Sequence, residues 1–168
     1  MIKNSFLFSI AAIVVVSLLI AATGYTTLLT TVYAQTLGEP FFKETGKITS
    51  QKEISSNRMQ VSYSANGTLK DDMNVTNKGD FVSISRGDNL TFAQGQGILA
   101  TTDGSETASY DIIAVGNVTQ EGNPVIVGAA AYRTNSTEDL AFLNNVLGIF
   151  KAELDETGSF TSTEWQWK

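Results

Sequence analysis

Short segments of alternating apolar and polar residues, separated by turn residues, restrict the fold of this chain more than any other feature. Apolar side chains recur at every second position from Met59 through Val61 and Tyr63 to Ala65. A period of two is that of a β-strand with one buried face. Turn signals recur at near-regular intervals, and Asp103-Gly104 is a strong hairpin signal. The pattern predicts an antiparallel meander of short strands.

A sheet of this kind must close into a barrel or stack as a sandwich to hide its edges. Gly95, Gly97, Gly116 and Gly128 lie inside or at the ends of expected strands, where glycine suits sharp bends and close backbone approach. Because a closed barrel needs such bends, we favour a barrel over a sandwich. The expected strands are 46–55, 58–65, 68–75, 81–85, 91–102, 107–115, 124–132, 148–154 and 159–167.

The expected turns include two that carry glycine, Asn66-Gly67 and the segment 77–80. The helical period appears once, at 138–143, where we expect a short helix or a single helical turn. Ser136 or Thr137 would cap it, because hydroxyl side chains accept hydrogen bonds from the first backbone amides of a helix.

The chain begins with an apolar leader whose only charged residue is Lys3 and whose apolar core lies at 6–22. Small residues at Val32 and Ala34 fit a signal-peptidase site, so we predict cleavage after Ala34. The alternative is an uncleaved anchor, since about 20 apolar residues can span a membrane. Both place the domain outside, either secreted or on the outer face of the cytoplasmic membrane. We expect a signal peptide or anchor at 1–34, a linker at 35–45 and a β-barrel domain at 46–168.

The composition excludes several kinds of chemistry. The chain has no histidine and no cysteine, so a Ser-His-Asp triad, a thiol nucleophile and the usual zinc sites are impossible. Asp71-Asp72 lacks the spacing of a calcium loop and is best interpreted as a solvated turn, as is Arg86-Gly87-Asp88. We expect no metal and no cofactor. The net charge of −6 falls to −7 without Lys3, which argues against a nucleic-acid partner.

Five Asn-x-Ser/Thr sequons make the exported domain a predicted glycoprotein. The alternative is that asparagine, glycine and threonine are simply the residues that β-turns use. The predicted glycosylation sites are Asn66, Asn74, Asn89, Asn117 and Asn135.

Several motifs occur in a fixed order along the expected domain, at 93–104, 139–145, Gly148-Ile149-Phe150, 153–158 and 164–168. Together they resemble the small uncharacterised prokaryotic members of the allene oxide cyclase-like barrel superfamily, which also includes the plant dirigent proteins. The resemblance covers about 46–168 and implies an antiparallel barrel of about eight strands with a central cavity, frequently assembled as trimers. The matching segments are turns, glycines and core positions, so no catalytic residue can be carried over.

The last expected strand contains the one group that we single out as a candidate catalytic residue, Glu164. Alternation puts Glu164 on one face of this strand and Trp165 and Trp167 on the other. If the tryptophans point outward, Glu164 lies inside the barrel, where burial would raise its pKa. If they point inward, they form an apolar wall and Glu164 faces solvent, which is the commoner arrangement for a charged residue. The candidate ligand-binding residues are Tyr110, Tyr132, Arg133, Trp165 and Trp167.

Three functions remain open at this stage. A binding protein would use the barrel interior as an apolar pocket for a small lipid-like or aromatic ligand. A structural protein of the cell envelope would have a filled interior. An isomerase or cyclase, which the resemblance implies as the alternative, would need at least two polar groups that converge in the pocket. The sequence ranks binding or structural roles first and enzymatic activity second, so it favours a protein that is not an enzyme.

Overall fold

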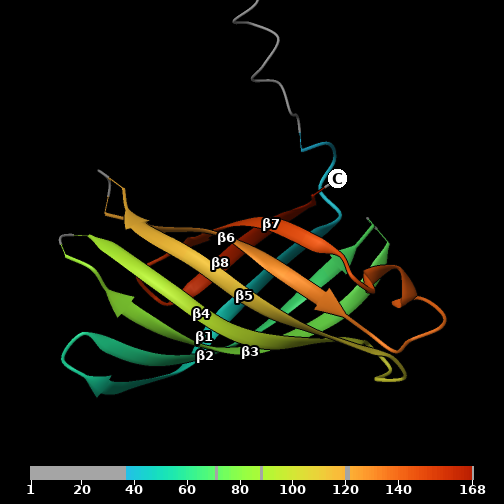
Figure 1. Ribbon diagram of the computed structural model, residues 1–168, viewed down its shortest axis with the longest axis horizontal. Coiled ribbons are helices and arrows are strands. Elements are labelled where there is room, and N and C mark those ends of the chain that lie inside the picture. Colours follow the sequence, from blue (N-terminus) through green and yellow to red (C-terminus); the bar gives the residue numbers. More distant parts are fainter. Residues whose placement is uncertain (1–36, 71, 88, 120–121, 168) are drawn as a thin grey trace, which may run out of the picture. The chain divides into compact units, whose positions relative to one another are not determined.

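The chain forms a closed antiparallel barrel in which each strand pairs with the next and β8 pairs with β1 (Figure 1). A computed structural model describes residues 37–70, 72–87, 89–119 and 122–167. The predicted closed meander barrel is confirmed, with eight strands in place of the nine expected segments, whereas the predicted leader and its predicted cleavage site lie outside the described residues. The strands are β1 (Phe42–Ser55), β2 (Arg58–Leu69), β3 (Met73–Ser85), β4 (Leu90–Thr101), β5 (Thr107–Val118), β6 (Pro124–Arg133), β7 (Leu147–Leu154) and β8 (Ser159–Gln166).

Two of the expected turns are wrong. Asn66-Gly67 lies inside β2, where Asn66 pairs with Thr45 on one side and Thr76 on the other. The segment 77–80 lies inside β3. Residues typical of turns serve here inside the barrel: Asn77 is buried and hydrogen-bonded, and Gly79 leaves room for the Tyr63 ring. The expected strand 68–75 is therefore split by the real β2–β3 turn.

The remaining hairpins follow the sequence prediction closely. The Asp103-Gly104 turn joins β4 to β5, and the segment 155–158 joins β7 to β8. The first strand begins at Phe42, four residues before its expected start at Gly46, because 42–47 pairs with both β2 and β8.

The expected helical turn is a three-residue 3-10 helix, η1 (Ala141–Leu143), in the β6–β7 loop. The predicted hydroxyl cap is wrong, because the residue before η1 is Leu140 and no side chain caps the helix. Instead, the Glu106 carboxylate accepts hydrogen bonds from the backbone amides of Glu138 (3.1 Å) and Leu140 (2.6 Å). No helix within the described ranges is long and apolar enough to cross a membrane.

The β6–β7 loop closes one end of the barrel, on the right in Figure 1. Leu140 and Leu143 are fully buried in an apolar cluster that includes Phe42, Leu69 and Leu99. We call this the plugged end. The β1–β2, β3–β4, β5–β6 and β7–β8 hairpins lie at the opposite end, which we call the hairpin end.

Candidate functional site

The barrel encloses a cavity of about 90 Å³, which we call the chamber. All eight strands contribute to its wall, and most of the lining is aliphatic or aromatic. Small side chains at Ala93, Ala114, Ala130 and Ala152 leave the space open, because larger residues at these inward positions would fill it. The interior is therefore hollow in part.

A second cavity, of about 290 Å³, lies at the hairpin end and forms the mouth of the chamber. Four side chains line both cavities, so the chamber and the mouth adjoin. They are Ile48, Phe81, Ile126 and Leu154. Together, the two adjoining cavities are the candidate space for a molecule longer than the chamber alone could hold.

Four polar side chains form a continuous hydrogen-bonded chain inside the barrel. The Tyr110 hydroxyl donates to Asn77 Oδ1 (2.6 Å), and Asn77 Nδ2 donates to Glu44 Oε2 (2.8 Å). Because the Tyr110 proton is used for Asn77, the Tyr63 hydroxyl is the donor in its hydrogen bond to the Tyr110 hydroxyl. Burial raises the pKa values of Tyr63 and Tyr110 well above the ordinary value of a tyrosine, so both phenols stay protonated.

Glu164 is the most deeply buried carboxyl group among the described residues, with 4% of its surface exposed. The Tyr132 hydroxyl donates to Glu164 Oε2 (2.8 Å), and Oε1 has no hydrogen-bond partner in the described part of the chain. A buried carboxyl oxygen without a partner is costly, because it has lost water and gained nothing in exchange. Glu164 also lines the chamber, but Oε1 itself is buried beside Gly148, so a bound molecule would reach this oxygen only if the carboxyl group turned toward the chamber.

Burial governs the electrostatics of both carboxyl groups. It raises the pKa of Glu164 to about 8; the Tyr132 hydrogen bond opposes this rise, and the neighbouring Glu44 charge adds to it. Burial likewise raises the pKa of Glu44 to about 7, against the lowering effect of the Asn77 hydrogen bond. At neutral pH, therefore, Glu164 is largely protonated and Glu44 is near its midpoint.

Inward-facing glycines make room for these polar groups. A Cβ atom at Gly148 would overlap the Glu164 carboxyl group, and one at Gly97 would overlap the Tyr110 hydroxyl. Gly148 lies on β7, beside β8, and Gly97 pairs directly with Tyr110 across β4 and β5. At Gly97, therefore, glycine is required by the close approach of a side chain and not by a bend of the strand.

The structure brings together three of the residues that the sequence singled out. Glu164, Tyr110 and Tyr132 all line the chamber, and the two tyrosine rings lie 5.2 Å apart between centroids. Of the two arrangements considered for β8, the structure adopts the one with Glu164 inside and both tryptophans outside.

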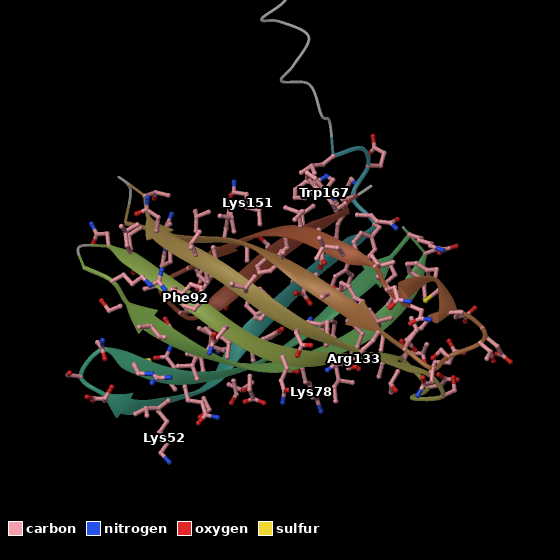
Figure 2. All side chains as sticks on the ribbon, in the orientation of Figure 1. Lys52, Lys78, Phe92, Arg133, Lys151 and Trp167 are labelled. Carbon is pink, nitrogen blue, oxygen red and sulfur yellow. The ribbon has the colours of Figure 1, made fainter. Side chains whose placement is uncertain are left out.

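The other three candidates do not line the chamber. Arg133 forms an exposed ion pair with Asp111 on the outer wall (2.8 Å). Trp165 is half-buried on the outer face, and Trp167 is 49% exposed. Figure 2 shows Trp167 together with Lys78 and Lys151 on the outside of the barrel. In this arrangement, none of these three side chains contacts the chamber.

Three residues of the site were not predicted. Glu44 fell in the expected linker and Asn77 in an expected turn, so neither was considered as an inward position. Tyr63 was placed correctly on the face shared with Val61, and this alternation was the available signal for an interior position. Extending the period of two back from Ile48 would have placed Glu44 inside as well.

The asparagines of all five sequons are exposed, on outer strand faces at Asn66, Asn74 and Asn117 and in connections at Asn89 and Asn135. This placement is compatible with glycosylation, which stays a prediction. Among the described residues, no group of three acidic side chains lies close enough to share a metal ion.

Comparisons with known proteins place the fold but not the activity. No protein-family model matches the chain, and no curated protein matches its sequence. The similar solved structures include a conserved protein of unknown function from Rhodopseudomonas palustris (TM-score 0.60, 12% identity), a protein of unknown function from Clostridium acetobutylicum (0.61, 13%) and a β-barrel-like protein from Acinetobacter baumannii (0.61, 14%). The alignments cover 76%, 77% and 77% of this chain and 94%, 98% and 94% of those chains. At such identities, the similarity shows a shared barrel fold.

Proposed function

We propose that this chain is an exported binding protein that holds a small, mainly apolar molecule in the chamber and mouth of its barrel. One observation carries the proposal: an apolar cavity that adjoins a mouth is lined by Glu164, whose buried carboxyl oxygen Oε1 has no partner among the described residues. An apolar pocket with a few convergent polar groups is the usual form of a small-molecule site. The polar groups would orient the ligand, and the aromatic wall would supply most of the contact area.

We also propose that the chain belongs to the allene oxide cyclase-like superfamily, as the sequence motifs indicate. The closed eight-stranded meander and its central cavity support this assignment. A trimeric assembly is part of the same proposal.

Titration with Nile red, a neutral apolar dye, tests the binding function. Dye emission should rise along a saturable, single-site curve, and protein purified under native conditions should carry bound apolar material that native mass spectrometry detects. Emission from Trp165 and Trp167 is a poor reporter, because both side chains lie outside the barrel.

Two neighbouring alanines of β6 provide a matched pair of variants. Ala130 lines the chamber and is 2% exposed, whereas Ala131 points outward and is exposed. Ala130→Leu should abolish dye binding because three added carbon atoms fill much of so small a chamber, and Ala131→Leu should leave binding unchanged. Circular dichroism would verify that both variants fold. The binding function would be refuted if the folded native chain showed no saturable binding, or if the two variants bound the dye equally. The structural role in the cell envelope would then remain.

A further inference from the structure

We propose that the ligand of the chamber is an apolar amine whose protonated nitrogen lies between the carboxyl groups of Glu164 and Glu44. This inference rests on the proposed binding function and adds the chemical class of the ligand. It depends on the charges inside the barrel, on the hydrogen-bond acceptors left over there and on the aromatic rings around them.

The charges inside the barrel have one sign. Two carboxyl groups, Glu44 and Glu164, line the chamber, and no lysine or arginine is among the lining residues of the chamber or the mouth. Every lysine and arginine within the described ranges is exposed. The chain therefore supplies no internal positive charge to balance a buried carboxylate, and a ligand that carries one would meet this need. An anionic ligand would face both glutamates without any compensating cation.

The hydrogen-bond acceptors of the two glutamates suit an ammonium group. Glu164 Oε1 has no partner among the described residues, while Oε2 accepts from Tyr132. Glu44 accepts a hydrogen bond from Asn77 through Oε2. An alkylammonium has three donors and no acceptor, so it pairs with the ionised form of Glu164, whereas an ether or a carboxylate ligand would need the protonated form as its donor.

Aromatic rings surround this position. Tyr110 and Tyr132 lie 5.2 Å apart between ring centroids, and Phe42 and Phe150 complete the wall near Glu164. Aromatic faces attract cations, and the attraction is strongest where water is excluded. The same rings give an alkyl or aryl body an apolar surface, which continues through Ile48 and Phe81 into the mouth.

The pH dependence of binding has a defined sign. Burial raises the pKa of both glutamates above its ordinary value, so the empty chamber retains protons at neutral pH. An ammonium group favours the ionised carboxylates and expels those protons, so its apparent affinity must increase with pH. The titratable groups that face Glu164 are Glu44 from β1, Tyr63 from β2, Tyr110 from β5 and Tyr132 from β6. The three tyrosines stay neutral here, so the two glutamates determine the sign.

A matched series of eight-carbon compounds tests the inference: octylamine, octanol and octanoate, each used to displace Nile red from the full exported domain. An alkylamine stays protonated below a pH of about 10. Octylamine should bind at least about tenfold more tightly than octanoate near pH 8, and its affinity should increase by up to about tenfold per pH unit between about pH 6 and pH 8. Octanol should bind with little dependence on pH.

Two variants locate the effect. Glu164→Gln should weaken octylamine binding by about tenfold or more and reduce its pH dependence to the part that comes from Glu44, while octanol binding should stay within about threefold. Glu53→Gln, which changes an exposed glutamate on β1, should alter neither.

The outcomes separate the two proposals. If Nile red and octanol bind but octylamine has no advantage over octanoate, the inference fails and the binding function stands. If octylamine binds well but Glu164→Gln does not weaken it, the inference fails as well. If neither the dye nor any of the three compounds binds the folded domain, the binding function itself fails.

Discussion

Replacing Glu164 with glutamine should stabilise the barrel at alkaline pH, although it alters a buried polar residue. Glu164 is 4% exposed, and burial raises its pKa from the ordinary value of 4.5 to about 8. Ionisation is therefore disfavoured in the folded chain. Glutamine has nearly the same shape and can still accept the Tyr132 hydrogen bond, but it cannot ionise.

The sign and size of the effect follow from the two pKa values. Above pH 4.5 the unfolded chain loses the Glu164 proton while the folded chain keeps it, so the stability that this proton contributes is complete below pH 4.5. That stability is lost as the pH rises through about 8. At about 1.4 kcal/mol per pH unit, the difference between the two pKa values corresponds to at most about 5 kcal/mol. Because water entry and relaxation soften the burial of a charge, we expect about 2 to 5 kcal/mol.

Urea unfolding followed by far-ultraviolet circular dichroism, at several pH values between about 5 and 9, measures this difference. The free energy of unfolding of the native chain should fall across this range. Glu164→Gln should be less stable by about 1 kcal/mol near pH 5, because its second amide hydrogen lacks a partner, and more stable near pH 9. The residual pH dependence of the variant should come from Glu44, whose pKa is also raised.

Glu53→Gln on the outer wall is the control and should track the native chain. Asp103 should not affect this comparison. Hydrogen bonds from Thr101 and Ser105 lower its pKa to about 2, so the stability that it contributes is lost only below the measured range of about pH 5 to 9. A native chain whose stability is constant or rises between pH 5 and 9, or two curves that never cross, would refute the assignment of Glu164 as a buried, uncompensated carboxyl group.

Further changes probe the support of the site, the plug and the leader. Gly148→Ala should cost about 1 to 3 kcal/mol in urea unfolding, because its Cβ overlaps the Glu164 carboxyl group; combined with Glu164→Ala, the cost should shrink, and strict additivity would contradict this contact. Glu106→Ala should cost about 1 to 3 kcal/mol and speed amide exchange in the β6–β7 loop, because two backbone donors lose their acceptor; unchanged exchange would show that the carboxylate does not hold the loop. Residues 1–45 fused to a reporter should place it outside the cytoplasm, with a mature chain that begins at Gln35 if the leader is cleaved; retention inside would contradict export.

The barrel was predictable because its information is local. Alternation along Met59 to Ala65 assigns the inner face of β2, and hairpin signals such as Asp103-Gly104 mark chain reversals. The same rules failed where an interior polar residue resembles a turn residue. Asn77 and Gly79 have the composition of a turn, but the first holds Glu44 and the second faces the ring of Tyr63. Local propensity does not contain this information, because it depends on what lies across the barrel.

The arrangement of the site was not predictable, because its contacts join strands that are distant in the sequence. Tyr132 and Glu164 are 32 residues apart, and Glu44 and Asn77 are 33 residues apart. These pairs meet only after the barrel closes with its particular register. The orientation of Glu164 was left open for the same reason: alternation separates it from Trp165 but does not say which face is inside.

Stability and binding are linked through Glu164. An apolar residue in its place would remove the cost of a buried carboxyl group but would leave the buried Tyr132 hydroxyl without an acceptor. The fold thus explains Oε2, which accepts from Tyr132, but not the unpartnered Oε1, which the proposed ligand would use. A ligand that carries an ammonium group, as proposed, would pair with the carboxylate at the pH where the empty barrel is least stable. Since a ligand stabilises the native state in proportion to the logarithm of its concentration over its dissociation constant, the increase in Tm caused by octylamine must grow from about pH 6 to about pH 8. The increase in Tm caused by octanol must not grow over this range. A similar trend for both compounds would show that the charge of the ligand does not determine how much it stabilises the barrel.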